Sequence, residues 1–367
     1  MYDLNSTDLP PHPHLPADVP DIALNNVFTK RYTAGARCSC TDRGNNTAAC
    51  CGAIMPRPPK ELIPGKKYGY WDGFHDMHTI NRTDYCGHDN TTIAELEQRR
   101  IRQAYRAALS FTDRNIGVVL AGLDSAGFGG STIVVLWSDH GYQLGDNSQW
   151  AKHTNFEHAT RIPFMVHLPP KLFPTFTPGR TTALLENIDL YPSLVELAMG
   201  QTLPRCPEGN VASRGTATCT EGLSFAPLLL RAPRTAGAAS LSSAPPQWKS
   251  ASFSQYSRLE EAVMGYTARV LGYRYTEWVT FNASTNTLKD SGPDWGDIVG
   301  VELYEHDDAI DASTGGLANG CDWNVETRNL AHVPAYAAKV HELAALLRKG
   351  WRGALPAPPG ATAGGHA

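Results

Sequence analysis

The residues best suited to chemistry are Ser138-Asp139-His140-Gly141, which follow directly on the apolar, β-branched run Ile133–Trp137. Ligands of open α/β sheets bind at the carboxyl ends of the strands, and Asp139 and His140 stand at such an end. A carboxylate beside an imidazole can hold a divalent cation. The pattern therefore predicts a metal site here, with a simple strand-end turn as the alternative.

A lysine, Lys152, follows His140 after twelve residues. Near a metal, its compact positive charge could bind an anionic substrate oxygen and stabilise charge that develops in the reaction. Tyr142, Gln143 and Trp150 flank these groups and are candidates for lining a substrate pocket, with ordinary packing as the alternative. We therefore expect the acid and the amine to share one site.

The elements that must position these residues follow an α/β pattern. Residues 93–126 have helical periodicity and end at a glycine-rich turn. The run that follows is apolar on both faces, which suits a central parallel strand. A second short strand is expected at Pro163–Leu168 and a helix at Ile188–Met199. Close by, Glu157 and Arg161 are expected to form a structural ion pair.

The C-terminal part has a different character. Ala251–Tyr256, Met264–Val270 and Tyr273–Phe281 alternate as strands and predict a small antiparallel sheet. Arg269 and Arg274 could contact an anionic sugar, although a solvated sheet edge is the simpler interpretation. A terminal helix is expected at 335–351. The predicted organisation is an α/β domain over 1–230 with a cysteine-rich insertion at about 31–92, a low-complexity loop over 231–247, a C-terminal subdomain over 248–352 and a disordered tail over 353–367.

Composition limits the function classes. The chain has 367 residues and a formal net charge of −4, so no global basic field indicates a nucleic-acid partner. No apolar stretch is long enough to span a membrane. Eight cysteines and five N-glycosylation sequons are typical of a secretory protein, either lysosomal or extracellular, but the first residues lack the features of a signal peptide. One resolution is that the chain begins inside a longer protein. The sequons are at Asn5, Asn45, Asn81, Asn90 and Asn282.

The cysteines are unevenly distributed. Cys206 and Cys219 flank a short polar loop, and we expect a disulfide between them. A second group crowds one polar segment, where disulfides, a zinc site and free thiols remain alternatives. That group consists of Cys38, Cys40, Cys50, Cys51 and Cys86, while Cys321 stands alone.

Several motifs resemble the second half of the sulfatases, and in particular their iduronate-2-sulfatase branch. The densest are Ser-Asp-His-Gly-Tyr-Gln-Leu-Gly-Asp at 138–146, Trp-Ala-Lys-His-Thr-Asn-Phe-Glu at 150–157 and Thr-Arg-Ile-Pro-Phe at 160–164. Further likeness continues through residues 186–193, 203–206, 264–266, 273–278 and 302–304. The resemblance covers most of the chain, apart from residues 33–90, 232–247 and the tail.

The resemblance implies an alkaline-phosphatase-like three-layer α/β/α fold, here without its N-terminal part, and a smaller antiparallel α+β C-terminal subdomain. It implies hydrolysis of a sulfate ester, on a small molecule or a glycan, by formylglycine hydrate and a calcium ion. Asp139 and His140 match metal-site residues of the family, and His140 could instead orient the formylglycine hydrate. Lys152 matches the lysine that binds sulfate.

The chain also departs from the family. No cysteine begins a Cys-x-[Pro/Ser]-x-Arg motif, which supplies formylglycine, and the family's first metal-binding Asp pair has no counterpart. Asp307-Asp308 is such a pair, but we expect it to be a solvated turn. The chain is therefore expected to hold part of the site and to be inactive alone. The alternatives are a phosphodiesterase or phosphonate hydrolase of the same superfamily and a catalytically inactive sulfatase fragment.

Overall fold

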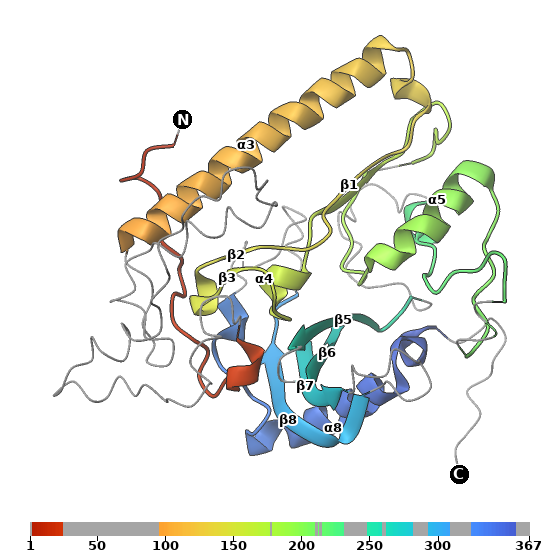
Figure 1. Cartoon of the computed structure of the whole chain (residues 1–367). Coiled ribbons are helices and arrows are strands. Elements are labelled where there is room, and N and C mark those ends of the chain that lie inside the picture. Colours follow the sequence, from red (N-terminus) through yellow and green to blue (C-terminus); the bar gives the residue numbers. More distant parts are fainter. Residues whose placement is uncertain are drawn as a thin grey trace, which may run out of the picture. The chain divides into compact units, whose positions relative to one another are not determined.

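The computed structural model describes residues 2–24, 95–176, 178–209, 212, 215–230, 248–258, 262–281, 293–308 and 324–356 (Figure 1). The chain divides into two compact units. Unit 1 contains Met1–Ala17, Leu24–Val118 and Tyr142–Thr154, and unit 2 contains Asp18–Ala23, Val119–Gly141 and Asn155–Ala367. Each unit is described below by itself. The cysteine group at 38–86, Cys321, four of the sequons, the 231–247 loop and the tail from 357 lie outside the described residues.

The helix predicted over 93–126 is α3, Glu95–Ser125. Its first turns are rich in Glu, Gln, Arg and Ala, which are strong helix formers. It ends in a Schellman motif, because Phe128 N donates to Leu123 O and Gly127 N donates to Asp124 O, at 3.1 and 2.9 Å. Gly127 takes the left-handed φ of +79° that this motif requires. Among the described helices, none combines the length and apolar character needed to cross a bilayer.

Unit 1 also holds a short hairpin of β2, Gln143–Leu144, and β3, Trp150–Ala151, joined across the 3-10 turn η5, Asp146–Ser148. Arg102 of α3 is buried and donates to Leu144 O at 2.8 Å, and it pairs with Asp8 at 2.9 Å. The helix therefore holds the hairpin through a backbone carbonyl as well as through packing.

In unit 2 the expected strand is β1, Val134–Trp137, but its partner corrects the prediction of a central parallel strand. β1 pairs antiparallel with β4, Phe164–His167, in a two-stranded sheet. Leu136 and Trp137 are 37% and 47% exposed, so this run is not covered on both faces by described residues. A short apolar run predicts a strand well, but it carries no information about the direction of the partner strand.

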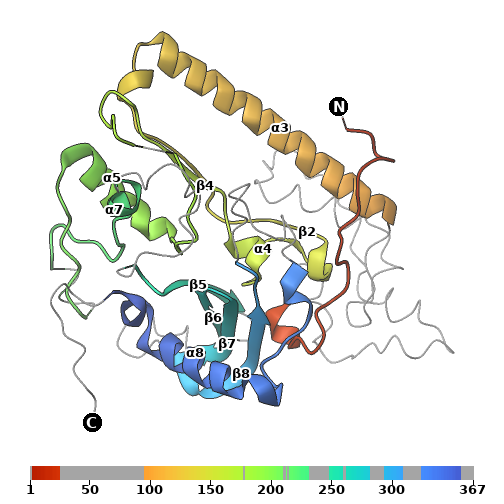
Figure 2. The ribbon, with the colours of Figure 1, turned by 180° about the vertical axis from the view of Figure 1, so that it is seen from behind.

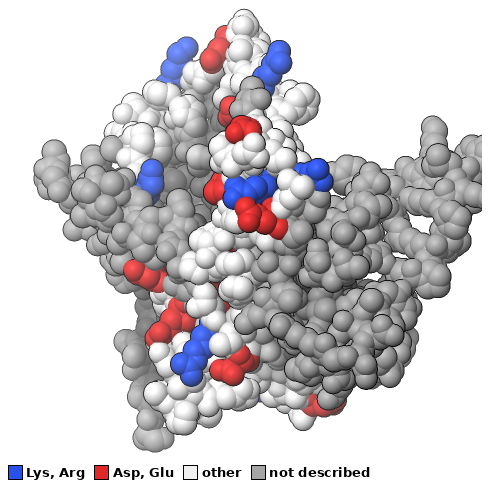
Figure 3. Space-filling model, turned by 90° about the vertical axis from the view of Figure 1, so that its left-hand side faces the viewer, with Lys and Arg blue, Asp and Glu red and all other residues white. Residues whose placement is uncertain are grey.

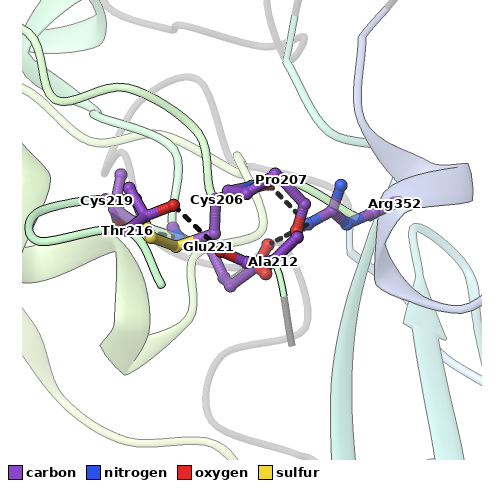
Figure 4. Close-up of a disulfide and its surroundings, with 9 residues drawn as sticks. Cys206, Pro207, Ala212, Thr216, Cys219, Glu221 and Arg352 are labelled. Carbon is purple, nitrogen blue, oxygen red and sulfur yellow. Dashed lines mark hydrogen bonds and ion pairs between the residues drawn. A yellow bond between two sulfur atoms is a disulfide. The ribbon is translucent and has the colours of Figure 1, made fainter. Parts of the chain in front are cut away.

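The first core of unit 2 packs α5, Leu190–Met199, against α7, Ala226–Leu229 (Figure 2). Its buried members are Leu168, Leu197, Phe225, Ala226 and Trp248. The Cys206–Cys219 disulfide that the sequence predicts is present in unit 2 (Figure 4). Arg352 donates to Cys206 O at 2.7 Å and pairs with Glu221 at 2.9 Å.

The C-terminal part of unit 2 is a four-stranded antiparallel sheet in the order β5-β6-β7-β8. Its strands are β5, Ala251–Arg258, β6, Val263–Val270, β7, Tyr273–Phe281, and β8, Pro293–Glu305. Helix α8, Ala337–Lys349, covers it with Leu343 and Leu347 (Figure 2). The predicted antiparallel subdomain is therefore confirmed, while β8 was not predicted.

Short elements complete the chain. They are the helix α4, Glu157–Thr160, and the 3-10 turns η1, Asp21–Ala23, η4, Gly129–Ser131, η6, Asn187–Asp189, η8, Asn324–Thr327, η9, Pro334–Tyr336, and η10, Trp351–Ala354. The mixture of helices and strands, with a smaller antiparallel sheet at the C-terminal end, agrees with the predicted fold class. On the face shown in Figure 3, acidic and basic side chains are interspersed among the described residues.

Candidate functional site

The Asp139–Gly141 turn leaves the end of β1 in unit 2 and is closed by local hydrogen bonds. Ser138 Oγ donates to His140 O at 2.7 Å, and His140 N donates to Asp139 Oδ1 at 3.1 Å. The amide of Asn187 lies within 3.3 Å of Ser138 O and donates to it. The Asp139 side chain is 82% exposed, so its carboxylate is directed to solvent and can accept a ligand.

His140 and Asp139 are brought together, with His140 Nε2 at 3.2 Å from Asp139 Oδ2. The other ring nitrogen, Nδ1, lies 2.8 Å from Gly141 O. A carbonyl oxygen can only accept, so Nδ1 carries a proton. A neutral ring would then set the Nε2 lone pair against the carboxylate. The pair is favourable when Nε2 is also protonated or when a cation lies beside both groups.

Gly141 connects the turn to α4. Its N–H donates to Ala159 O at 2.9 Å. A Cβ at this position would lie 2.1 Å from His158 O and 2.8 Å from Arg161 O, both of them backbone atoms. Only glycine therefore fits where the turn meets α4, and the contact fixes the distance between the two segments.

Helix α4 is in turn held by buried charges. Glu157 N donates to Glu326 Oε2 at 2.9 Å. The Glu157 carboxylate, which is almost fully buried, pairs with Arg269 Nε at 3.1 Å and with Arg161 at 3.6 Å. The predicted Glu157–Arg161 pair is thus confirmed. Asp308 is not a solvated turn residue, because it also pairs with Arg269, at 2.6 Å.

Arg274 and Glu326 form a second buried pair. Arg274 is fully buried, contacts Glu326 Oε1 and lies 3.5 Å from Glu302. His306 Nε2 lies 3.1 Å from the same Glu326 oxygen. Burial opposes the charged carboxylate, but the charge of Arg274 and the hydrogen bond from His306 hold the pKa of Glu326 well below its usual range.

The prediction that Arg269 and Arg274 lie on a solvated sheet edge is therefore wrong. β6 and β7, which carry them, are the inner strands of the sheet. Their carboxylate partners Glu157 and Glu326 come from segments far away in the sequence. No local pattern around either arginine could have indicated those partners.

The other segment that carries predicted site residues belongs to unit 1. Tyr142 stacks on Tyr105 with ring centroids 5.1 Å apart, and burial raises the pKa of Tyr142. Trp150 is only 2% exposed and pairs with Leu144 across the hairpin. Lys152 follows β3 directly.

The backbone around Lys152 is strained. Asn147, Ser148, Ala151 and His153 all have positive φ, at 55°, 54°, 67° and 65°. For residues with a Cβ this conformation costs about 1–2 kcal/mol each. Such residues cluster at functional sites, where the surrounding structure enforces them. Asn147 and His153 are types that are enriched in this region, but Ser148 and Ala151 are not, so the strain at those two positions could not be predicted from residue type.

Two buried amide side chains in this hairpin are unusual. Within the part of the chain that the structure describes, the side-chain amide atoms of Gln143 and Asn147 are buried and have no hydrogen-bond partner. A buried amide in this state costs about 1–3 kcal/mol. Strain and unsatisfied polar groups therefore occur together next to Lys152.

The predicted site residues thus fall into two groups. Asp139 and His140 lie together in unit 2, whereas Tyr142, Trp150 and Lys152 lie in unit 1. Their convergence on one site remains a prediction. Among the described residues, no three His, Cys, Asp or Glu side chains gather in a way that could hold a metal ion, so Asp139 and His140 are at most part of a coordination shell.

Comparison with known proteins identifies related chains. The family model described as Sulfatase matches residues 68–200. The chain is 35% identical to iduronate 2-sulfatase of Mus musculus over 303 residues, which are 71% of this chain and 53% of that protein. It is 34% identical to iduronate 2-sulfatase of Homo sapiens over 258 residues, 60% of this chain and 46% of that protein. The chain therefore spans about half the length of these curated relatives.

A solved structure also resembles the chain. That structure shows a protein in complex with its substrate, D-glucosamine-2-N,6-O-disulfate. The TM-score is 0.49 and the sequence identity is 20%, and the likeness covers 71% of this chain and 42% of that chain.

Proposed function

We propose that the chain is part of a hydrolase of sulfate esters, because residues 68–200 match the Sulfatase family model and the chain is 34–35% identical to iduronate 2-sulfatases. One observation carries the proposal. The family match over residues 68–200 includes both the Asp139–Gly141 turn and Lys152, which are the residue types needed for a cation and for an anionic group. By likeness to iduronate 2-sulfatase, we further propose a sulfated glycan as substrate and a secretory, lysosomal or extracellular location.

Asp139 is proposed as a ligand of a divalent cation. Its exposed carboxylate offers the oxygen donors that calcium prefers, and the local hydrogen bonds of the turn hold its backbone in place. A calcium ion bound there would supply Lewis-acid polarisation of the sulfate oxygens, next to a formylglycine nucleophile. The described residues fit this role only in part, since two donors do not complete a calcium shell.

His140 and Lys152 are proposed as the catalytic side chains. The hydrogen bond from Nδ1 to Gly141 O fixes the ring, so Nε2 is the ring atom that would either bind the cation or accept and pass on a proton. The Lys152 ammonium is proposed to bind a sulfate oxygen and to stabilise the negative charge of the group in transfer. The strained residues on either side of Lys152 would fix the direction of its side chain.

Tyr142 and Trp150 are proposed to border the bound substrate. Both are aromatic, and aromatic faces pack well against the apolar faces of sugar rings. Trp150 is buried against its hairpin, so its contribution would be to shape the wall of the site rather than to reach into solvent.

Steady-state kinetics of the complete hydrolase proposed here would test the proposal. With an aryl sulfate substrate, Lys152→Ala and Asp139→Ala should each lower kcat by about 10²–10³-fold or more. Lys171→Ala, which removes an exposed lysine elsewhere, is the matched control and should leave kcat unchanged. Near-parental turnover in both site variants, or a preference for a phosphonate monoester or phosphodiester over the sulfate, would contradict the assignment.

A further inference from the structure

We propose that Glu326 is a positioning residue for the Asp139–Gly141 turn and that it acts through α4. The inference rests on the proposed function, since it concerns the same turn. It adds that the C-terminal subdomain, which contains none of the proposed catalytic residues, sets the geometry of the cation-binding end of β1.

The first step is the contact between the turn and α4. The Gly141 N–H donates to Ala159 O at 2.9 Å, and the lack of space for a Cβ places the turn directly against the α4 backbone. A displacement of α4 would therefore move the turn, because the two backbones are in contact without an intervening side chain.

The second step is that α4 does not hold itself. It is four residues long, and a helix this short is unstable on its own. Its N-cap residue is Phe156, which makes no side-chain capping hydrogen bond. Instead, Glu326 Oε2 accepts from Glu157 N at 2.9 Å, so a carboxylate from η8 satisfies an N-terminal amide of α4.

The third step is that Glu326 is itself fixed. Its side chain is fully buried, and its other oxygen contacts Arg274 of β7 and His306, which follows β8. A second tie joins the same elements, since Arg269 of β6 pairs with the Glu157 carboxylate. The sheet therefore holds α4 in position through two buried ion pairs, Arg274–Glu326 and Arg269–Glu157.

A single isosteric substitution separates the capping contact from the rest. Every neighbour of the Glu326 carboxylate named above is a donor, so in Glu326→Gln the new NH₂ group must face one of them. The one oxygen that remains should face Arg274 and His306, because the charged Arg274 donor makes a stronger hydrogen bond than the Glu157 N–H does. The NH₂ group then faces Glu157 N, so the hydrogen bond that caps α4 is lost. The volume of the side chain at position 326 is retained.

His306→Gln is the matched control. It changes a partner of Glu326 Oε1 but leaves Oε2 free to accept from Glu157 N. Both variants perturb the same buried cluster. If Glu326 only stabilised the fold as a whole, each variant would raise hydrogen exchange at the turn in proportion to its loss of global stability.

Hydrogen exchange of the present chain, followed by mass spectrometry of peptides, tests the proposal. In Glu326→Gln, exchange of the peptide containing Gly141 should rise about tenfold relative to the β7 peptide over 273–281. In His306→Gln, the ratio of the two peptides should stay at its wild-type value. Equal ratios in the two variants, or an unchanged Gly141 peptide in Glu326→Gln, would overturn the proposal.

A kinetic measurement on the full-length protein links this to function. Glu326→Gln should lower kcat for an aryl sulfate about tenfold with little change in KM, and His306→Gln should not. Absence of sulfatase turnover in the wild type would count against the proposed function alone, because the exchange experiment does not depend on activity. Parental kcat in Glu326→Gln, together with a loosened Gly141 peptide, would show that the turn does not need this support and would overturn the positioning role.

Discussion

The Asp139–Gly141 turn and the hairpin over Gln143–His153 follow each other in the sequence, yet their backbones are held in opposite ways. The turn makes hydrogen bonds to α4 and to Asn187, and it has glycine at the one position where a Cβ would collide with backbone. The hairpin places four non-glycine residues at positive φ. Two of its buried amide side chains have no hydrogen-bond partner within the described chain.

The difference separates two ways to place a functional side chain. The position of the turn is set by partners elsewhere in the fold, which form hydrogen bonds with its polar groups. The hairpin keeps strain and unsatisfied groups, which persist only where the surroundings enforce them. Substitutions that add a Cβ to the turn should therefore harm the protein, and substitutions that remove one from the hairpin should relieve it.

The largest effect is expected for Gly141→Ala. The added Cβ meets backbone oxygens at 2.1 and 2.8 Å, which cannot move without displacing α4. We expect the free energy of unfolding in urea to fall by about 3 kcal/mol. Gly117→Ala in α3, where nothing lies within 4 Å, is the control and should instead raise it by up to about 1 kcal/mol. A loss of less than about 1 kcal/mol for Gly141→Ala would show that the turn is not tightly packed.

Acid should weaken the support of the turn in a way that depends on Glu326. Its folded pKa lies below the unfolded value, so its contribution to stability is present above about pH 4.5 and is lost as the pH falls further. The groups that face this carboxylate are Arg274, His306 and the Glu157 amide. The stability advantage of wild type over Glu326→Gln should therefore shrink by about 2 kcal/mol between pH 6 and pH 3, measured by urea unfolding. A constant difference over this range would mean that folding does not lower the pKa of Glu326.

Asn187→Ala should have a smaller effect. It removes the donor to Ser138 O and leaves that carbonyl to water, so a loss of about 1 kcal/mol is expected. Gln201→Ala, at an exposed position just after α5, is the control and should change stability by less than about 0.5 kcal/mol. If the two variants behave alike, Asn187 does not contribute to holding the turn.

Much of this arrangement could be predicted from local patterns, and the remainder depends on distant partners. Periodicity and β-branched runs predicted α3, β4 and the strands β5 to β7, and the strand end predicted the Asp139 turn. β8 was missed because Gly296 and Gly300 interrupt its alternation and its register shifts against β7. Glu326 gave no signal at all, since its importance comes only from Arg274, His306 and α4.

The smallest effect, and the most direct test of strain in the hairpin, is expected for Ala151→Gly. Ala151 is buried in β3 at a φ of 67°, a conformation that glycine adopts without the cost borne by a Cβ. The relief of about 1–2 kcal/mol is partly offset by the greater entropy of the unfolded glycine chain, so a net gain of about 0.5 kcal/mol in unfolding free energy is expected. Ala268→Gly is the matched control, because Ala268 is a fully buried alanine in β6 whose φ is not positive, and it should lose about 1 kcal/mol. Equal losses in the two variants would mean that the backbone beside Lys152 carries no strain, and the contrast between hairpin and turn would then reduce to hydrogen bonding alone.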